Sequence, residues 1–290
     1  MKIVKPDPKA LDLGRFGAGR MKEERELNYP EKQAEPERPG VARKAADRRV
    51  TRLDDEREMA RRCFGYGCWN APYWFIGQEQ GMAHEENDDL RLRIEAWRYF
   101  GSRELDDACA FHLHIGETRW CGEHAKPQPT WKKLIRTLLT FLGERVDPAS
   151  VLAYQKHNWG RQPGETCVIE ISGLAGNNLD VERDRESYQT ERIKDIRDRM
   201  IRYAPKFIVM YGTSDRAPWR AIAEGAEVIP EDTLPITIWK RENTILLMTP
   251  APASRAGNWN IYWERLGVRL RSLTTVSNKT LDQCCADSRM

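Results

Sequence analysis

The chain has 290 residues, a length that accommodates one large domain or two small ones. Hydrophobic residues make up 40% of it and charged residues 31%, and 47 Lys and Arg nearly balance 44 Asp and Glu, which leaves a net charge of +3. This balance excludes a strongly acidic protein and does not by itself establish a nucleic-acid partner. The 20 Gly and 16 Pro follow no period, so collagen and simple repeats are excluded.

The sequence lacks the signals of export and membrane insertion. No apolar run approaches the ~18 residues that cross a bilayer, and the N-terminus has no apolar segment of a secretory signal. The seven Cys are odd in number and irregularly spaced, which favours reduced thiols over a disulfide framework. We therefore expect a cytoplasmic protein with no membrane partner.

Residues 1–62 differ in composition from the rest of the chain. They hold 17 Lys and Arg against 13 Asp and Glu, a net charge of +4, with five Pro in the first 39 residues. We expect an extended arm, with a short helix possible over Val41–Arg62. Two interpretations stay open: a solubilising tail, or an arm that follows a phosphate backbone.

From Cys63 onward, apolar runs typical of buried strands alternate with helical patterns. In chain order these are a strand at Tyr73–Ile76, helices at Asp88–Phe100 and Thr130–Gly143, a strand at Thr166–Ser172, a helix at Glu182–Tyr203, a strand at Lys206–Gly212, a helix at Pro218–Ala223, strands at Leu234–Trp239 and Thr244–Met248, and a helix at Asn260–Leu270. The alternation predicts an α/β fold, a three-layer α/β/α sandwich with a mostly parallel central sheet. We expect this domain over residues 63–273 and a frayed polar tail over 274–290.

Three strand ends carry polar or conformationally special segments, and ligands bind at the carboxyl ends of strands in open α/β sheets. They are Gly77-Gln78-Glu79-Gln80-Gly81, Glu170-Ile171-Ser172-Gly173-Leu174 and Thr249-Pro250-Ala251-Pro252-Ala253-Ser254-Arg255. With PKFIVMYG at 205–212 between the last two, their order resembles the uracil-DNA glycosylase superfamily. The resemblance covers roughly residues 70–272.

The first segment is similar to the family motif of the type GQDPY or GEAPG. Gly77 and Gln78 match its Gly-Gln, and Glu79 falls where one branch has its water-polarising Asp. Gln80 replaces the Pro, and Gly81 replaces the Tyr that keeps larger bases out. The resemblance implies a catalytic role for Glu79, because a carboxylate stabilises an oxocarbenium-like sugar and orients water.

The other two segments depart from the family. Its base-reading Asn is absent, and Glu170 is the best match to that position, with Ser172 as the alternative. A carboxylate accepts from N3–H of uracil and repels O4 unless it is protonated. It can also accept from an exocyclic amine, so a base other than uracil is conceivable.

Thr249 stands where the resemblance places the catalytic His of an HPSP motif. Thr249 can donate a hydrogen bond to the leaving base but brings no positive charge, and His84 is the His closest to the first motif in sequence. The resemblance assigns the DNA-contacting loop to Pro250, Ser254, Arg255 and Asn258. Phe111 or Trp74 can hold a flipped base by its face.

These observations predict a monofunctional DNA glycosylase that removes uracil or another deaminated base in base-excision repair, as a monomer with no cofactor and no metal. Cys63 and Cys68 lack the close pairing that the family's iron–sulfur branches show. Structural interpretations stand beside this one: Glu170 in an ion pair with an Arg, and Phe111 in the core. The rival functions are a non-catalytic DNA or modified-base binder and an enzyme on free nucleosides or nucleotides.

Overall fold

The structure is a computed structural model that describes residues 54–78, 86–173, 185–212, 215–254 and 259–287. The chain divides by its internal contacts after Lys44, and every described residue belongs to the part Ala45–Met290. Residues 54–62 are helical, and Met59 and Ala60 are buried in the core. The short helix considered for Val41–Arg62 is thus present over residues 54–62, and it packs with the domain that was expected from residue 63.

Eight strands form one mixed sheet in the order β3-β1-β4-β2-β5-β8-β7-β6. The strands are β1 (Gly65–Gly67), β2 (Tyr73–Gly77), β3 (Leu105–Asp106), β4 (Thr166–Glu170), β5 (Phe207–Tyr211), β6 (Glu227–Ile229), β7 (Thr237–Arg241) and β8 (Thr244–Thr249). The four central strands β4, β2, β5 and β8 are mutually parallel. β1 pairs antiparallel with β4, and β7 pairs antiparallel with both β8 and β6.

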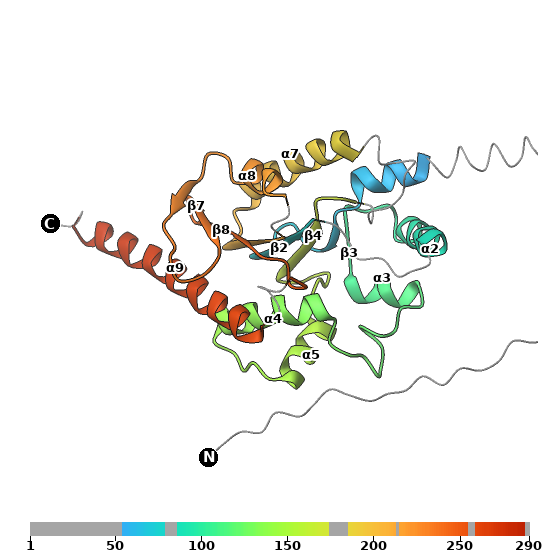
Figure 1. Cartoon of the computed structure of the whole chain (residues 1–290), viewed down its shortest axis with the longest axis horizontal. Coiled ribbons are helices and arrows are strands. Elements are labelled where there is room, and N and C mark those ends of the chain that lie inside the picture. The colour runs from blue at the N-terminus through green and yellow to red at the C-terminus, as the bar shows by residue number, and fades with distance from the viewer. Residues whose placement is uncertain (1–53, 79–85, 174–184, 213–214, 255–258, 288–290) are drawn as a thin grey trace, which may run out of the picture. The chain divides into compact units, whose positions relative to one another are not determined.

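Helices cover both faces of this sheet, as Figure 1 shows. They are α2 (Glu86–Tyr99), α3 (Ala108–His114), α4 (Pro129–Leu142), α5 (Pro148–His157), α7 (Arg185–Tyr203), α8 (Ala217–Ile222) and α9 (Asn260–Asp287). On one face α7 and α8 pack on side chains that include Trp74 and Ile208, and on the other α4 and α9 pack on side chains that include Phe75 and Val209. Alternate residues of β2 and β5 thus enter opposite cores, which confirms the three-layer α/β/α fold with a mostly parallel sheet.

Two helix ends differ from the expectation. The helix expected from Thr130 begins at Pro129, and Gln128 caps it: the Gln128 side chain accepts from the Trp131 amide, and Pro129 occupies the first turn, where its missing N–H costs nothing. Gly143 ends α4 in the left-handed conformation, as expected.

The last helix also differs, because α9 continues to Asp287. The expectation of a frayed tail from residue 274 is therefore wrong as far as residue 287. None of the helices among the described residues is both long and apolar enough to cross a membrane.

The expectation that all cysteines are reduced is also wrong. Cys109 on α3 forms a disulfide with Cys121, twelve residues further along the chain, and their Cα atoms lie 5.4 Å apart. Cys63, Cys68 and Cys167 are free thiols. Residue spacing did not reveal the disulfide, because the turn after α3 brings the two residues together.

Candidate functional site

The four parallel central strands end at the same edge of the sheet. In the strand register Gly77 of β2 lies beside Glu170 of β4, and Tyr211 of β5 lies beside Thr249 of β8. The segments that sequence analysis singled out therefore begin at one edge, which is where open α/β sheets bind ligands.

A cavity of about 170 Å³ opens at this edge, on the α4 side of the sheet. Its described lining comes from strands β1, β4 and β5, helices α2, α3 and α4, and the segment between α3 and α4. The lining residues are Tyr66, Arg93, His112, Trp120, Gln128, Thr130, Trp131, Val168, Glu170 and Tyr211. An engineered cavity of about 150 Å³ holds benzene, so this volume accommodates an aromatic ring.

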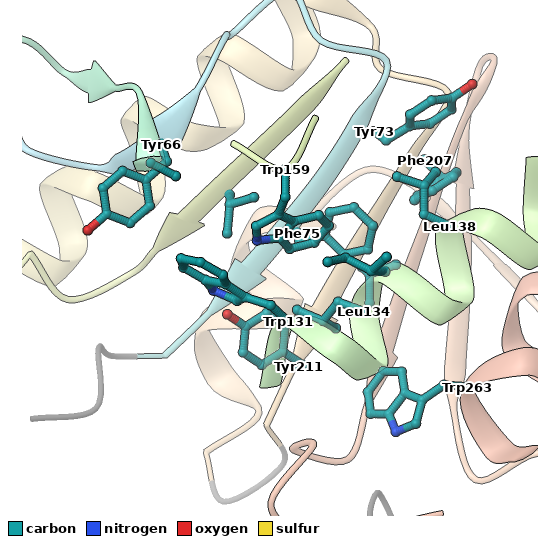
Figure 2. Packing of buried hydrophobic residues seen from close by; sticks show 14 of the residues in the cluster. Tyr66, Tyr73, Phe75, Trp131, Leu134, Leu138, Trp159, Phe207, Tyr211 and Trp263 are labelled. Atoms are coloured by element: carbon teal, nitrogen blue, oxygen red, sulfur yellow. The ribbon is translucent and has the colours of Figure 1, made fainter. Parts of the chain in front are cut away.

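Aromatic side chains form much of the wall. The rings of Tyr66 and Trp131 lie 6.5 Å apart at 78°, and the His112 ring meets the Trp131 ring edge-on at 5.3 Å. Figure 2 shows Tyr66, Trp131 and Tyr211 reaching this region from β1, α4 and β5. Faces and edges of this kind hold planar heterocycles by stacking and edge-to-face contact.

Glu170 supplies the carboxylate of the cavity. Its Oε1 accepts a hydrogen bond of 3.0 Å from the Tyr211 hydroxyl. Burial and then the nearby Glu170 charge raise the pKa of Tyr211 well above its usual value. The Tyr211 hydroxyl therefore stays protonated and donates a hydrogen bond to the carboxylate. The tyrosine thus fixes the position of one carboxylate oxygen.

Gly77 makes room for this carboxylate. A Cβ atom at position 77 would lie 2.0 Å from Glu170 Oε2 and 2.6 Å from the Tyr211 hydroxyl oxygen. The glycine that sequence analysis matched to the family motif therefore has a packing reason here: the Glu170 side chain lies over its Cα. Any larger side chain would push the carboxylate away from its present place.

Arg192 holds the backbone at the end of β4. This fully buried guanidinium of α7 donates to the carbonyls of Glu170 at 2.7 Å and Ile171 at 2.7 Å. It also donates to the carbonyls of Ala60, Arg61 and Cys63. Burial lowers the pKa of Arg192 to about 10, while attraction to Glu170 is among the effects that oppose this. The cation is thus tied to the strand end and interacts favourably with its carboxylate.

The His112 ring contributes a hydrogen-bond acceptor to the cavity lining. Its Nδ1 lies 2.7 Å from the Ala108 carbonyl, so Nδ1 carries the proton and Nε2 is an acceptor. Burial lowers the pKa of His112 to about 4, which keeps the ring neutral near pH 7. His112 therefore offers an acceptor and no positive charge.

Arg93 and Gln128 supply donors. The Arg93 Nε donates to Asp89 at 2.9 Å, and its guanidinium also donates to the Tyr66 hydroxyl. The Gln128 Oε1 accepts from the Trp131 amide at 2.6 Å, which leaves the amide NH₂ as the group Gln128 can offer. The cavity thus combines two acceptor side chains with a guanidinium and an amide.

The first predicted motif is only partly described. Glu79, Gln80, Gly81 and His84 lie outside the described residues. Gln78 joins two strand ends: its carbonyl accepts from the Ser172 amide at 2.9 Å, and its Nε2 donates to the Asp215 carbonyl at 3.1 Å. Gln78 thus connects Ser172, which follows β4, with Asp215, which follows β5.

Thr249, which was expected to contact the leaving group, contacts a side chain of α9. Thr249 is fully buried, and its hydroxyl lies 2.5 Å from that of Tyr262 on α9. Among the described residues, the cavity lining does not include Thr249. Its hydroxyl is committed to the contact between β8 and α9.

The predicted stacking residues are both in the core. Phe111 is 2% exposed and packs 5.7 Å from the Tyr66 ring, and Trp74 is fully buried on the opposite face of the sheet. Neither belongs to the described lining of the cavity. Tyr66, Trp120, Trp131 and Tyr211 form the aromatic wall in their place.

The predicted DNA-contacting loop follows β8. Pro250 is buried, and the Ser254 hydroxyl donates to the Ala251 carbonyl at 2.6 Å. Lys133 of α4 donates to the Pro252 carbonyl, which fastens this loop to the helix. Arg255 and Asn258 lie outside the described residues.

Sequence reasoning missed Arg93, His112, Gln128 and Trp131 as site residues. Arg93 and His112 come from helices α2 and α3, and no strand-end motif marks them. Gln128 could have been identified as the residue that caps a helix, because the Pro129 that follows it is typical of the first turn of a helix. Among the described residues no group of three or more His, Cys, Asp or Glu side chains could hold a metal ion.

Comparison with known proteins gives no family for this chain. No protein-family model matches it, and no curated protein matches it in a sequence search.

Proposed function

We propose that this protein is a DNA glycosylase that hydrolyses the N-glycosidic bond of uracil or another deaminated base and leaves an abasic site. The observation that supports the proposal most is the cavity at the shared edge of the four parallel strands, with aromatic walls and the Glu170 carboxylate. A base flipped out of DNA needs such a pocket, in which rings hold its faces and polar groups bind its edge.

The reaction breaks the bond between the sugar C1′ and the base nitrogen. The sugar becomes oxocarbenium-like, water adds to C1′, and the water's proton is released as the base leaves. In this proposal Glu79 orients the water and stabilises the cation, as the resemblance implies. The guanidinium of Arg93 stabilises the negative charge on the departing base, a role that Thr249 and the neutral His112 cannot fill.

DNA is the partner of this activity, with the chain acting as a monomer in the cytoplasm. The Cys109–Cys121 disulfide is the observation that weighs against this location, because disulfides are rare in the cytosol.

Oligonucleotides with a single uracil, hypoxanthine or xanthine test the proposal. We expect the protein to produce alkali-labile abasic sites in at least one of them and none in the undamaged strand. Glu79→Gln should abolish release. Glu104→Gln is the matched control, because Glu104 pairs with Arg199 and is not part of the described cavity lining. No abasic site from any of the three at high protein concentration contradicts the proposal.

One observation favours a second candidate, a non-catalytic binder of DNA or modified bases. The Thr249 hydroxyl is bound to Tyr262, so the position that carries the catalytic His in the family does not supply a donor to the cavity here. This candidate predicts that a damaged oligonucleotide is retained without base release and that Glu79→Gln leaves the affinity unchanged.

A further inference from the structure

We propose that an exposed patch at the start of α9, formed by Trp259 and Ile261, binds the unpaired bases of single-stranded DNA beside the cavity. This inference rests on the proposed function, because it names the form of DNA that reaches the site. A duplex, whose bases are stacked on one another, offers this patch no free base face.

Trp259 lies at the same edge of the sheet as the cavity. Its carbonyl accepts from the Tyr262 amide at 3.1 Å, so Trp259 begins the first turn of α9. The Tyr262 hydroxyl lies 2.5 Å from that of Thr249, the last residue of β8. Thr249 is the register neighbour of Tyr211, which lines the cavity. Three successive contacts therefore connect Trp259 with the cavity.

The exposure of the patch contrasts with its surroundings. Trp259 is 68% exposed and Ile261 is 57% exposed, whereas Trp263, on the next turn of α9, is fully buried. An indole face binds bases of any sequence, because every base has a π-face. The Trp259 patch thus supplies the aromatic part of a surface for unpaired bases.

Helices α4 and α9 begin side by side at this edge. The Thr137 hydroxyl donates to the Trp263 carbonyl at 2.9 Å. Two turns further along α9, Arg271 donates to the Phe141 carbonyl at 2.7 Å. The contacts advance along both helices together, so the two run in the same direction, and Figure 1 shows them adjacent. Their N-termini, which carry partial positive charge, therefore lie together.

Side chains add to this positive charge. Residues 129–136 of α4 include three cations and no carboxylate, namely Lys132, Lys133 and Arg136. Lys133 donates to the Pro252 carbonyl, and its pKa is lowered by burial and then by repulsion from Lys132. The carboxylate of Glu264 on α9 is paired with Arg136 at 2.7 Å. The edge next to the Trp259 patch therefore attracts a phosphate backbone.

This combination of groups fits a single strand. A single strand presents both phosphates and the faces of unpaired bases, which ammonium groups and an indole bind respectively. In a duplex each base is covered by its neighbours, so only the phosphate contacts remain. The base that stacks on Trp259 belongs to a nucleotide flanking the one in the cavity.

The test measures the affinity for an undamaged, labelled oligonucleotide, as a single strand and as a duplex, by fluorescence anisotropy. Trp259→Ala should weaken single-strand binding about 5- to 100-fold, the range for one base stacked on an aromatic side chain. Trp259→Phe should retain most of the affinity, and duplex binding should change by less than about twofold in either variant. Unchanged single-strand affinity in Trp259→Ala, or equal losses for both forms of DNA, overturns the inference.

Tyr99→Ala is the matched control for exposure. Tyr99 is 71% exposed at the end of α2, where its ring stacks on His114 of α3. Its removal should change single-strand affinity by less than about twofold. A loss as large as that of Trp259→Ala would show that any exposed ring has this effect, which overturns the inference.

The salt dependence of binding tests the charged part of the surface. Lys132→Ala should reduce the slope of log affinity against log salt concentration by about 0.7, the value for one phosphate contact of a single strand. Trp259→Ala should leave this slope unchanged. Lys194→Ala is the control, because Lys194 pairs with Asp198 on α7, which covers the opposite face of the sheet. An unchanged slope in Lys132→Ala overturns the inference.

The outcomes separate this inference from the proposed function. A protein that binds the single strand through Trp259 and releases no damaged base contradicts the proposed function alone. Base release that Trp259→Ala leaves unaltered, together with unaltered binding, contradicts the inference alone. A second copy of the chain is the other occupant of such a patch, and a dimer that Trp259→Ala dissociates in sedimentation without DNA overturns the inference.

Discussion

The two ends of strand β4 carry the same chemical pair in different surroundings. Glu165 stands just before the strand and accepts from Tyr154 at 2.6 Å, and Glu170 ends it and accepts from Tyr211 at 3.0 Å. Both carboxylates are partly buried. The pair Glu170–Tyr211 lines a cavity, and the pair Glu165–Tyr154 is not part of its described lining.

This difference shows that the hydrogen-bonded pair alone does not make a binding site. At the carboxyl end, Gly77 on the neighbouring strand leaves space for the carboxylate, and Arg192 holds the backbone beneath it. At the amino end, Tyr154 belongs to α5, and its hydroxyl donates to Glu165 just before the strand. The surroundings of each pair therefore decide whether it stabilises the fold or faces a ligand.

The largest expected effect concerns the support at the carboxyl end. Arg192→Met removes the donors for five backbone carbonyls in the core and should lower the free energy of unfolding by about 3–5 kcal/mol, as for a broken buried charge contact. Urea denaturation measures this.

Arg161→Met is the control near the amino end. Arg161 pairs with Asp107 and its side chain is 32% exposed, so about 1 kcal/mol is expected. If Arg192→Met costs no more than this control, the two ends are equally supported and the contrast fails.

The pH dependence of stability tests the neutral His112. Its pKa is about 4 in the folded protein and about 6.5 when unfolded, so protons bind preferentially to the unfolded chain between these values. The contribution of His112 is complete above pH 6.5 and is lost as the pH falls to about 4, a change of about 3 kcal/mol. Chemical denaturation of the wild type and of His112→Gln, across pH 4–7, measures it. An identical pH slope in both would contradict a buried neutral ring.

Removal of the Cys109–Cys121 disulfide measures how much this bond contributes to the stability of the protein. It ties α3, which carries His112, to the residue after Trp120. Replacing both cysteines with Ser should cost about 2–3 kcal/mol, as expected for a short closed loop. The control is Cys68→Ser, a partly buried free thiol. Mass spectrometry of the alkylated protein gives the number of thiols before and after reduction, and no mass difference would show that the bond is absent.

The smallest expected effect comes from the hydroxyl groups of the two pairs. Tyr211→Phe and Tyr154→Phe each remove one hydrogen bond and should each cost about 1 kcal/mol of stability. Only Tyr211→Phe should also slow base release, because it frees the position of the Glu170 carboxylate. Equal effects of the two variants on release would show that Tyr211 does not position the site.

Sequence patterns predicted the central strands because these are continuous apolar runs buried on both faces. They missed β1, β3 and β6, which have only two or three residues each and so show no periodicity. The far end of α9 was missed because Leu273, Val276 and Leu281 are the large apolar residues there and stand among mostly polar neighbours, which makes the helical pattern weak.

For the candidate site, sequence patterns placed Gly77 and Glu170 together because both end parallel strands. They could not place Arg93 and His112, since tertiary packing of α2 and α3 brings these side chains to the sheet edge. For Phe111 the structural interpretation is the one confirmed, because its side chain enters the core. His112, the next residue on the same helix, reaches the cavity.

The contact between Gly77 and Glu170 makes these two positions a single unit of sequence variation. A protein with this cavity can carry a long carboxylate at the second position only while the first has no side chain. If the first position gains a methyl group, we expect the second to shorten to Asp or Asn, and the carboxylate at the end of β4 retreats from the cavity with it. A change in the size of the side chain at either position therefore requires a paired change on the adjacent strand.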